Sequence, residues 1–168
     1  FKNKNKTVGI VSAFFLTFIC WIVLTIVGAL PFYLGSVNLS FVDSFFESMS
    51  GITTTGATVI QDLDETSRSI LIWRSMLQWL GGIGIIVIAI AVFPMLKVGG
   101  MQSFKSEFSS KDDKILPRTV SIAIGIGLVY SGLTLFCFLA LVAAGMNIFD
   151  GIAHSMTIIA TGGFSTKN

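Results

Sequence analysis

Two short segments of this 168-residue chain combine threonine and glycine in a pattern that suits the binding of a dehydrated cation. The first reads TTTGAT over residues 53–58, and the second reads ATGGFS over residues 160–165. Neither segment contains a carboxylate, so the ligands would be backbone carbonyl oxygens, which replace the water shell of potassium in a narrow pore. Glycine permits the unusual backbone dihedrals that aim successive carbonyls at one axis. The chemistry expected of these loops is therefore ion selection.

The two loops belong to an internal repeat. A single constant shift along the chain aligns the segment that begins at Val42 with the segment that begins at Phe149. Six of 17 positions are identical without a gap, and they include Gly56 with Gly163. The apolar runs that precede the two segments align at the same offset. The chain therefore contains one complete unit and the first part of a second.

Each loop follows a short segment that we expect to form a pore helix, over residues 40–50 and 147–157. Ser40 is a plausible N-cap, and Asp43 would complement the dipole of the first turn. Semi-apolar segments of this length are typical of re-entrant helices, which enter a membrane without crossing it. The negative C-terminal end of each helix would then point toward the cavity and favour a cation.

Long apolar runs must carry these elements in a membrane. Hydrophobic residues make up 53% of the chain and charged residues 12%, whereas a soluble domain carries about 25% charge. Three runs of equal length, interrupted by a single charge at Arg74, cover residues 8–34, 70–96 and 119–145. Each run exceeds the length of about 20 residues that a membrane span needs. With a net charge of only +2, this composition excludes a soluble enzyme domain, a disordered chain and a nucleic-acid-binding protein.

The expected fold class is an all-α membrane protein built from repeated units of span, pore helix, filter loop and span. The first repeat covers residues 1–96, with spans 8–34 and 70–96, pore helix 40–50 and filter 53–58. A cytoplasmic loop over residues 97–118 separates it from an incomplete second repeat over residues 119–168, with span 119–145, pore helix 147–157 and filter 160–165. Lysine and arginine are concentrated before the first span and in the 97–118 loop, which places the N-terminus and that loop in the cytoplasm.

Four further features have alternative interpretations. Arg74 is expected to anchor its span or to bond the back of the filter, because a fixed cation would repel potassium. Glu47 is expected to hold filter-supporting groups, with direct ion binding as the alternative. His154 occupies the place of Glu47 in the second unit, as a satisfied helix side chain or as a pH sensor. Gly81 and Gly82 allow either close helix packing or room around a pore.

Proline and the scarcity of titratable residues add two expectations. Pro31 lies near the end of the first run and is expected to end its helix. One histidine and no acid–base pair within a span leave no catalytic constellation, so the chain is not expected to be an enzyme.

The runs FFESMSGITTTGAT, WRSMLQWLGGIGIIVIAIAVFPMLKVGGMQ and ATGGFS resemble the Trk-type potassium uptake proteins of the Trk, Ktr and HKT superfamily, over essentially the whole chain. The resemblance implies a pore subunit of four repeats with pseudo-fourfold symmetry, a potassium-channel-like architecture of which this chain would be a fragment. The key filter glycine would be Gly56 in the first repeat and Gly163 in the second. The ion-facing carbonyls would belong to Thr53, Thr54, Thr55 and Gly56, and to Ala160, Thr161, Gly162 and Gly163. A register shifted by one residue is the alternative for the second loop.

The resemblance also implies a cargo and partners. Potassium would be the transported ion, with no organic cofactor in this chain, and a glycine at position 56 favours potassium over sodium. The protein would lie in the cell inner (plasma) membrane in contact with lipid, as a homodimer of the full subunit that docks a cytoplasmic nucleotide-binding regulatory subunit. No nucleic acid is expected. The alternative functions are a pore for both sodium and potassium and a non-conducting membrane scaffold. A scaffold would have no use for two short helices that each end in a Thr-Gly loop.

Overall fold

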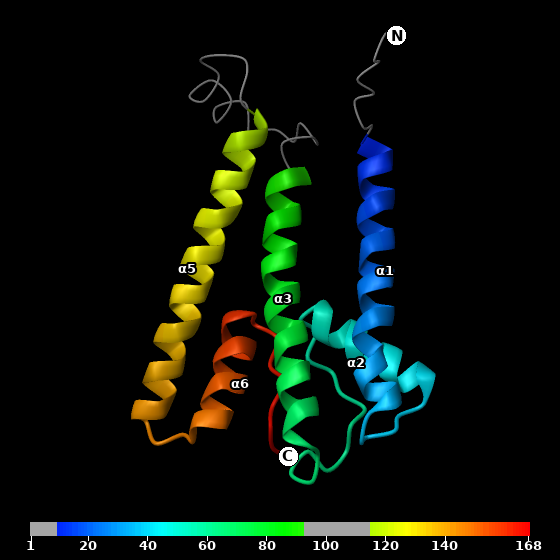
Figure 1. Cartoon of the computed structure of the whole chain (residues 1–168), viewed down its shortest axis with the longest axis vertical. Helices are drawn as coiled ribbons and strands as arrows, with labels where there is room; N and C mark the ends of the chain where they lie inside the picture. Colours follow the sequence, from blue (N-terminus) through cyan, green and yellow to red (C-terminus); the bar gives the residue numbers. More distant parts are fainter. Residues whose placement is uncertain (1–9, 93–114) are drawn as a thin grey trace.

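A computed structural model describes residues 10–92 and 115–168 of the chain (Figure 1). The N-terminal lysines, residues 97–114 of the basic loop, and residues 8–9 and 93–96 of the first two expected spans lie outside the described residues. The described part is helical and contains no strand. Its helices are α1 (Ile10–Leu34), α2 (Phe41–Ile52), α3 (Arg68–Val92), α5 (Ile115–Ala143) and α6 (Ile148–Ile159).

Helices α1, α3 and α5 are each long and apolar enough to cross a membrane. They run side by side in Figure 1, with the beginnings of α1 and α5 and the end of α3 at the same end of the molecule. The short helices α2 and α6 pack at the opposite end. Helix α2 contacts α1 and α3, and helix α6 contacts α3 and α5. Helix α3 is therefore the element that links the two short helices.

Both short helices, α2 and α6, begin with the same capping arrangement. The Ser40 side chain accepts a hydrogen bond from the backbone N–H of Asp43 at 3.1 Å, which confirms the expected cap. Asn147 accepts from the N–H of Asp150 at 2.9 Å in α6. The two pairs occupy equivalent positions of the two units, so the repeat extends to the hydrogen bonds that start each helix.

Several helix boundaries differ from those expected. Helices α2 and α6 continue two residues past their expected ends at 50 and 157, because Ile52 is buried and the last turn packs on α3. Helix α5 starts at Ile115, within the stretch expected to be a loop. The prediction that Pro31 ends the first helix is wrong, since α1 continues to Leu34. Burial of the adjacent Phe32, which is 0% exposed, outweighs the one hydrogen bond that proline removes.

A buried apolar cluster holds α1, α2 and α3 together with the segment after α2. It contains Phe32, Ile52, Ile60, Leu63, Ile70, Leu71 and Leu77. At its edge the indole N–H of Trp73 donates to the Gly28 carbonyl at 3.0 Å, so this tryptophan pins α3 to α1. Most large apolar side chains of α1 and α5 are instead exposed, as expected for surfaces that face lipid or further helices.

Candidate functional site

The C-terminal ends of α2 and α6 close with the same pair of hydrogen bonds. In the first repeat the N–H of Thr54 donates to the Gly51 carbonyl, and the N–H of Thr55 donates to the Ser50 carbonyl, each at 2.9 Å. The second repeat forms both bonds at the equivalent positions, again at 2.9 Å. This pattern is a Schellman motif, in which the residue after the C-cap is left-handed and is usually glycine.

Threonine occupies that left-handed position in both repeats. Thr54 and Thr161 each have a φ of 56°, and two residues later Gly56 and Gly163 have φ values of 80° and 77°. A left-handed conformation costs a residue with a Cβ about 1–2 kcal/mol. The same strain in two loops marks a conformation that the fold imposes, and such strain is concentrated at functional sites.

The residue between each left-handed pair has an ordinary φ, so handedness alternates along both loops. Alternation of this kind aligns successive peptide dipoles, whereas a regular strand makes them alternate in direction. The alternation also bears on the register of the second loop. Gly163, and not Gly162, has the positive φ that matches Gly56, which favours the register that pairs these two glycines.

The two loops lie against each other. A Cβ built on Gly56 would overlap the carbonyl oxygen of Gly162. Gly162 is itself buried against the side-chain amide of Gln78, which occupies the space that a Cβ would need. Gly163 is exposed, and a Cβ there meets nothing within 4 Å in the described part of the chain. Close approach therefore requires glycine at 56, a side chain at 162 would have to displace the Gln78 amide, and backbone conformation favours glycine at 56 and 163.

The remaining predicted site residues flank these glycines. Thr53 and Ala160 are the C-caps of α2 and α6. The Thr53 hydroxyl donates to the Met49 carbonyl at 2.7 Å and lies 2.8 Å from the Thr55 hydroxyl. Ala160 is buried and contacts Gly82, so a side chain at 82 would meet this cap. All eight predicted residues thus lie in two adjacent loops, with the caps as their fixed ends.

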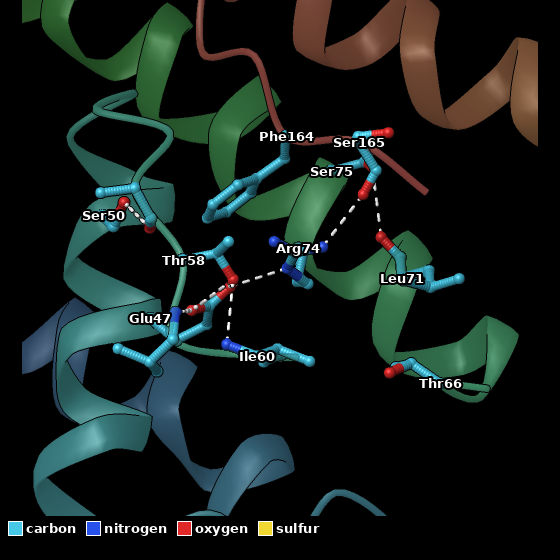
Figure 2. Close-up of polar contacts among 12 residues, drawn as sticks. Glu47, Ser50, Thr58, Ile60, Thr66, Leu71, Arg74, Ser75, Phe164 and Ser165 are labelled. Atoms are coloured by element: carbon cyan, nitrogen blue, oxygen red, sulfur yellow. Dashed lines mark hydrogen bonds and ion pairs between the residues drawn. The ribbon is translucent and has the colours of Figure 1, made fainter. Parts of the chain in front are cut away.

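The end of the first loop and the residue after it are held from behind by α2 (Figure 2). Both carboxylate oxygens of Glu47 accept from the Thr58 hydroxyl, at 2.9 and 3.1 Å, and one accepts from the Val59 N–H at 2.9 Å. The Ser50 hydroxyl donates to the Ala57 carbonyl at 2.5 Å. These bonds confirm the expected support of the loop by Glu47, which is 0% exposed within the described part of the chain.

Arg74 of α3 completes this support and extends it to the second loop (Figure 2). Its Nε donates to Glu47 at 2.7 Å, and its Nη1 donates to the Ser165 carbonyl at 3.0 Å. The guanidinium lies 4.1 Å from the centre of the Phe164 ring. Arg74 is 1% exposed, and of the two expected alternatives its hydrogen bonds match a residue that bonds the back of the loops.

Gln78 is a loop-supporting residue that the sequence interpretation missed. It lies one helical turn after Arg74, and its Oε1 accepts from the Phe164 N–H at 3.1 Å. The signal that points to it is the spacing of two polar side chains, one helical turn apart, on one face of an otherwise apolar span.

The end of the second loop is fastened by different side chains. The Thr166 hydroxyl donates to Asp150 at 2.7 Å and lies 3.2 Å from Nε2 of His154. This hydrogen bond lowers the pKa of the Asp150 carboxyl, which belongs to α6 and lies outside the spanning helices. His154 is thus a hydrogen-bonded side chain of α6, as expected, while the alternative of a pH sensor is not tested by this contact.

Comparison with known proteins gives consistent matches. The family model described as TrkH, cation transport protein, matches residues 1–168. The Trk system potassium uptake protein TrkH of Escherichia coli K12 is 51% identical over 160 residues, which are 94% of this chain and 33% of that protein. The Trk system potassium uptake protein TrkI of Halomonas elongata is 44% identical over 155 residues, covering 92% of this chain and 32% of that protein.

A solved structure matches as well. The crystal structure of the potassium transporter TrkH from Vibrio parahaemolyticus superposes with a TM-score of 0.83 at 41% identity. The match covers 99% of this chain and 32% of the crystallised chain. The chain therefore spans about a third of the length of the relatives it matches.

Proposed function

This chain belongs to the TrkH family of cation transport proteins, and from that premise we propose that it supplies two filter loops of a potassium-selective uptake pore. One observation carries the proposal. Two loops in adjacent positions share an alternation of left-handed and ordinary backbone, at Thr54 and Gly56 and again at Thr161 and Gly163. The relatives named as potassium uptake proteins support potassium as the ion.

In the proposed mechanism, potassium exchanges its water for backbone carbonyls of residues 53–56 and 160–163. The C-terminal ends of α2 and α6 add a negative field at the site, which favours a cation without a formal charge. The loops must keep their geometry while ions pass, and their rear hydrogen bonds provide this. Glu47 is neutralised by Arg74 at 2.7 Å, so the carboxylate holds the loop without acting as a fixed ligand.

The complete pore needs two further loops, which we assign to the remainder of a longer subunit with pseudo-fourfold symmetry. The exposed apolar faces of α1 and α5 suit contact with lipid or with those further repeats. We place the protein in the inner (plasma) membrane with the beginning of α1 on the cytoplasmic side. A homodimer of the full subunit and a nucleotide-binding regulatory subunit on the basic cytoplasmic face complete the proposal, and the relatives' designation as a Trk system supports a multicomponent assembly.

The direct test is uptake by a full-length subunit carrying this sequence, in cells without other potassium uptake. We expect growth at low potassium and uptake of rubidium, a potassium tracer, that excess sodium inhibits weakly. Sodium uptake equal to that of potassium would favour a pore for both cations. Absence of uptake of either ion by a folded, membrane-inserted protein would contradict the pore.

A further inference from the structure

Two polar side chains of α3 hold consecutive backbone groups of the second loop. Gln78 accepts a hydrogen bond from the Phe164 N–H at 3.1 Å, and Arg74 donates one to the Ser165 carbonyl at 3.0 Å. Gln78 is 0% exposed and Arg74 is 1% exposed. Helix α3 is the second span of the first repeat, so these bonds cross from one repeat to the other.

Arg74 also holds the first loop. Its bond to Glu47 connects to Thr58, the last residue of the first loop, and to Val59, which follows it. A continuous set of hydrogen bonds therefore runs from the first loop through α2 and α3 to Ser165 in the second (Figure 2).

Gln78 additionally packs against the second loop beside its contact with the first. A Cβ on Gly162 would lie 2.5 Å from both Nε2 and Oε1 of Gln78, and a Cβ on Gly56 would lie 3.8 Å from Nε2. The buried Nε2 has no hydrogen-bond partner among the described residues. The Gln78 amide therefore packs directly against Gly162 and lies beside the point where Gly162 meets Gly56.

We propose that Gln78 and Arg74 form a bracket between repeats that fixes the second loop against the first and thereby sets the discrimination between potassium and sodium. This inference rests on the proposed pore function. A carbonyl site selects between the two ions through its size and through the number and rigidity of its ligands. A loop released from the bracket can close around the smaller ion, so its preference for potassium falls.

The first test is Gln78→Leu in the full-length subunit. Leucine occupies a similar volume but leaves the buried Phe164 N–H without an acceptor, at a cost of about 1–3 kcal/mol. We expect the preference for potassium over sodium to fall about tenfold, a change equivalent to about 1.4 kcal/mol. Preference is measured by sodium competition in rubidium uptake and by the potassium and sodium concentrations that raise the melting temperature of the purified protein. A merely structural role would lower the melting temperature without changing the ratio of these concentrations.

The second test is a double-mutant cycle on the contact between Gln78 and Gly162. Gly162→Ala alone collides with Gln78, whereas Gly162→Ala in a Gln78→Ala background has room for the new methyl group. We expect the double variant to recover most of the melting temperature lost in Gly162→Ala, as a coupled pair does. Gly163→Ala is the matched control, because its φ of 77° causes its strain and no contact with Gln78 exists to be relieved.

Three results together would support the bracket. Gln78→Ala should be coupled to Gly162→Ala but not to Gly163→Ala, and Gln78→Leu should lower the preference for potassium. Additive effects at Gly162, or a wild-type preference in Gln78→Leu, would overturn the bracket. If neither ion changes the melting temperature of the wild type, the proposed pore fails. The melting-temperature cycle would then still decide whether Gln78 is coupled to Gly162 in the second loop.

Discussion

Replacement of Gly56 with serine is expected to lower both stability and potassium preference, for two separable reasons. The φ of 80° at this position strains any residue with a Cβ. The Cβ would also overlap the carbonyl oxygen of Gly162 in the neighbouring loop. Either the Gly162 peptide rotates or the two loops separate, and both outcomes disturb the carbonyls assigned to ion binding.

The expected magnitude follows from these two costs. Left-handed strain costs about 1–2 kcal/mol and overpacking against fixed atoms about 1–3 kcal/mol, so Gly56→Ser should destabilise by about 2–5 kcal/mol. Gly145 offers a matched control because it has a φ of 98° and nothing within 4 Å of a Cβ in the described part of the chain. Gly145→Ser should therefore show the strain of about 1–2 kcal/mol without the collision.

The assay compares the two variants in thermal unfolding of the purified full-length subunit and in sodium competition of rubidium uptake. Gly56→Ser should melt below Gly145→Ser and should be more strongly inhibited by sodium, while Gly145→Ser keeps the sodium sensitivity of the wild type. Equal melting temperatures, together with wild-type sodium sensitivity in Gly56→Ser, would refute the placement of Gly56 in the filter.

Three further predictions test the supports and the topology. Glu47→Gln and Arg74→Met should each destabilise the protein by about 3–5 kcal/mol, because each leaves its buried, charged partner unpaired. In denaturant unfolding, the double variant should lose less stability than the sum of the two single variants. Asn147→Ala should cost about 1 kcal/mol through loss of the α6 cap, which a fall in melting temperature would register and an unchanged value would contradict. In a cysteine-free background, Asn38→Cys, between α1 and α2, and Ala144→Cys, between α5 and α6, should both react with a membrane-impermeant maleimide added outside intact cells. Reaction of only one of them would contradict the prediction that both connections lie on the outer side of the membrane.

Features governed by local chemistry could be predicted from the sequence. Spans follow from the length of apolar runs, and the cap at Ser40 follows from residue types within one turn of the helix start. Which glycine of the second loop corresponds to Gly56 could be inferred only from the alignment of the two repeats, because residue type does not distinguish Gly162 from Gly163. The structure shows why each position is glycine: Gly163 has a left-handed backbone, and Gly162 is packed against the side chain of Gln78.

Contacts between repeats could not be predicted in the same way. Gln78 and Phe164 are 86 residues apart, and Arg74 and Ser165 are 91 apart, so no local pattern pairs them. The sequence did suggest that Arg74 either anchors its span or bonds the back of the filter, because a fixed cation facing the pore would repel potassium, but it left these two alternatives open. Its partners depend on how α3 packs between α2 and α6, which only the fold determines. Pro31 failed as a helix end for the same reason, since tertiary burial of Phe32 overrode a local preference.

The most direct test of the ion-selectivity assignment is an anomalous-scattering map of the full-length subunit crystallised with rubidium or thallium. The account predicts an ion peak bounded by backbone carbonyls of residues 53–56 and 160–163, with the Glu47 carboxylate directed away and bonded to Arg74. A peak held by the Glu47 carboxylate, or a map with ions in the pore but none between these two loops, would contradict it.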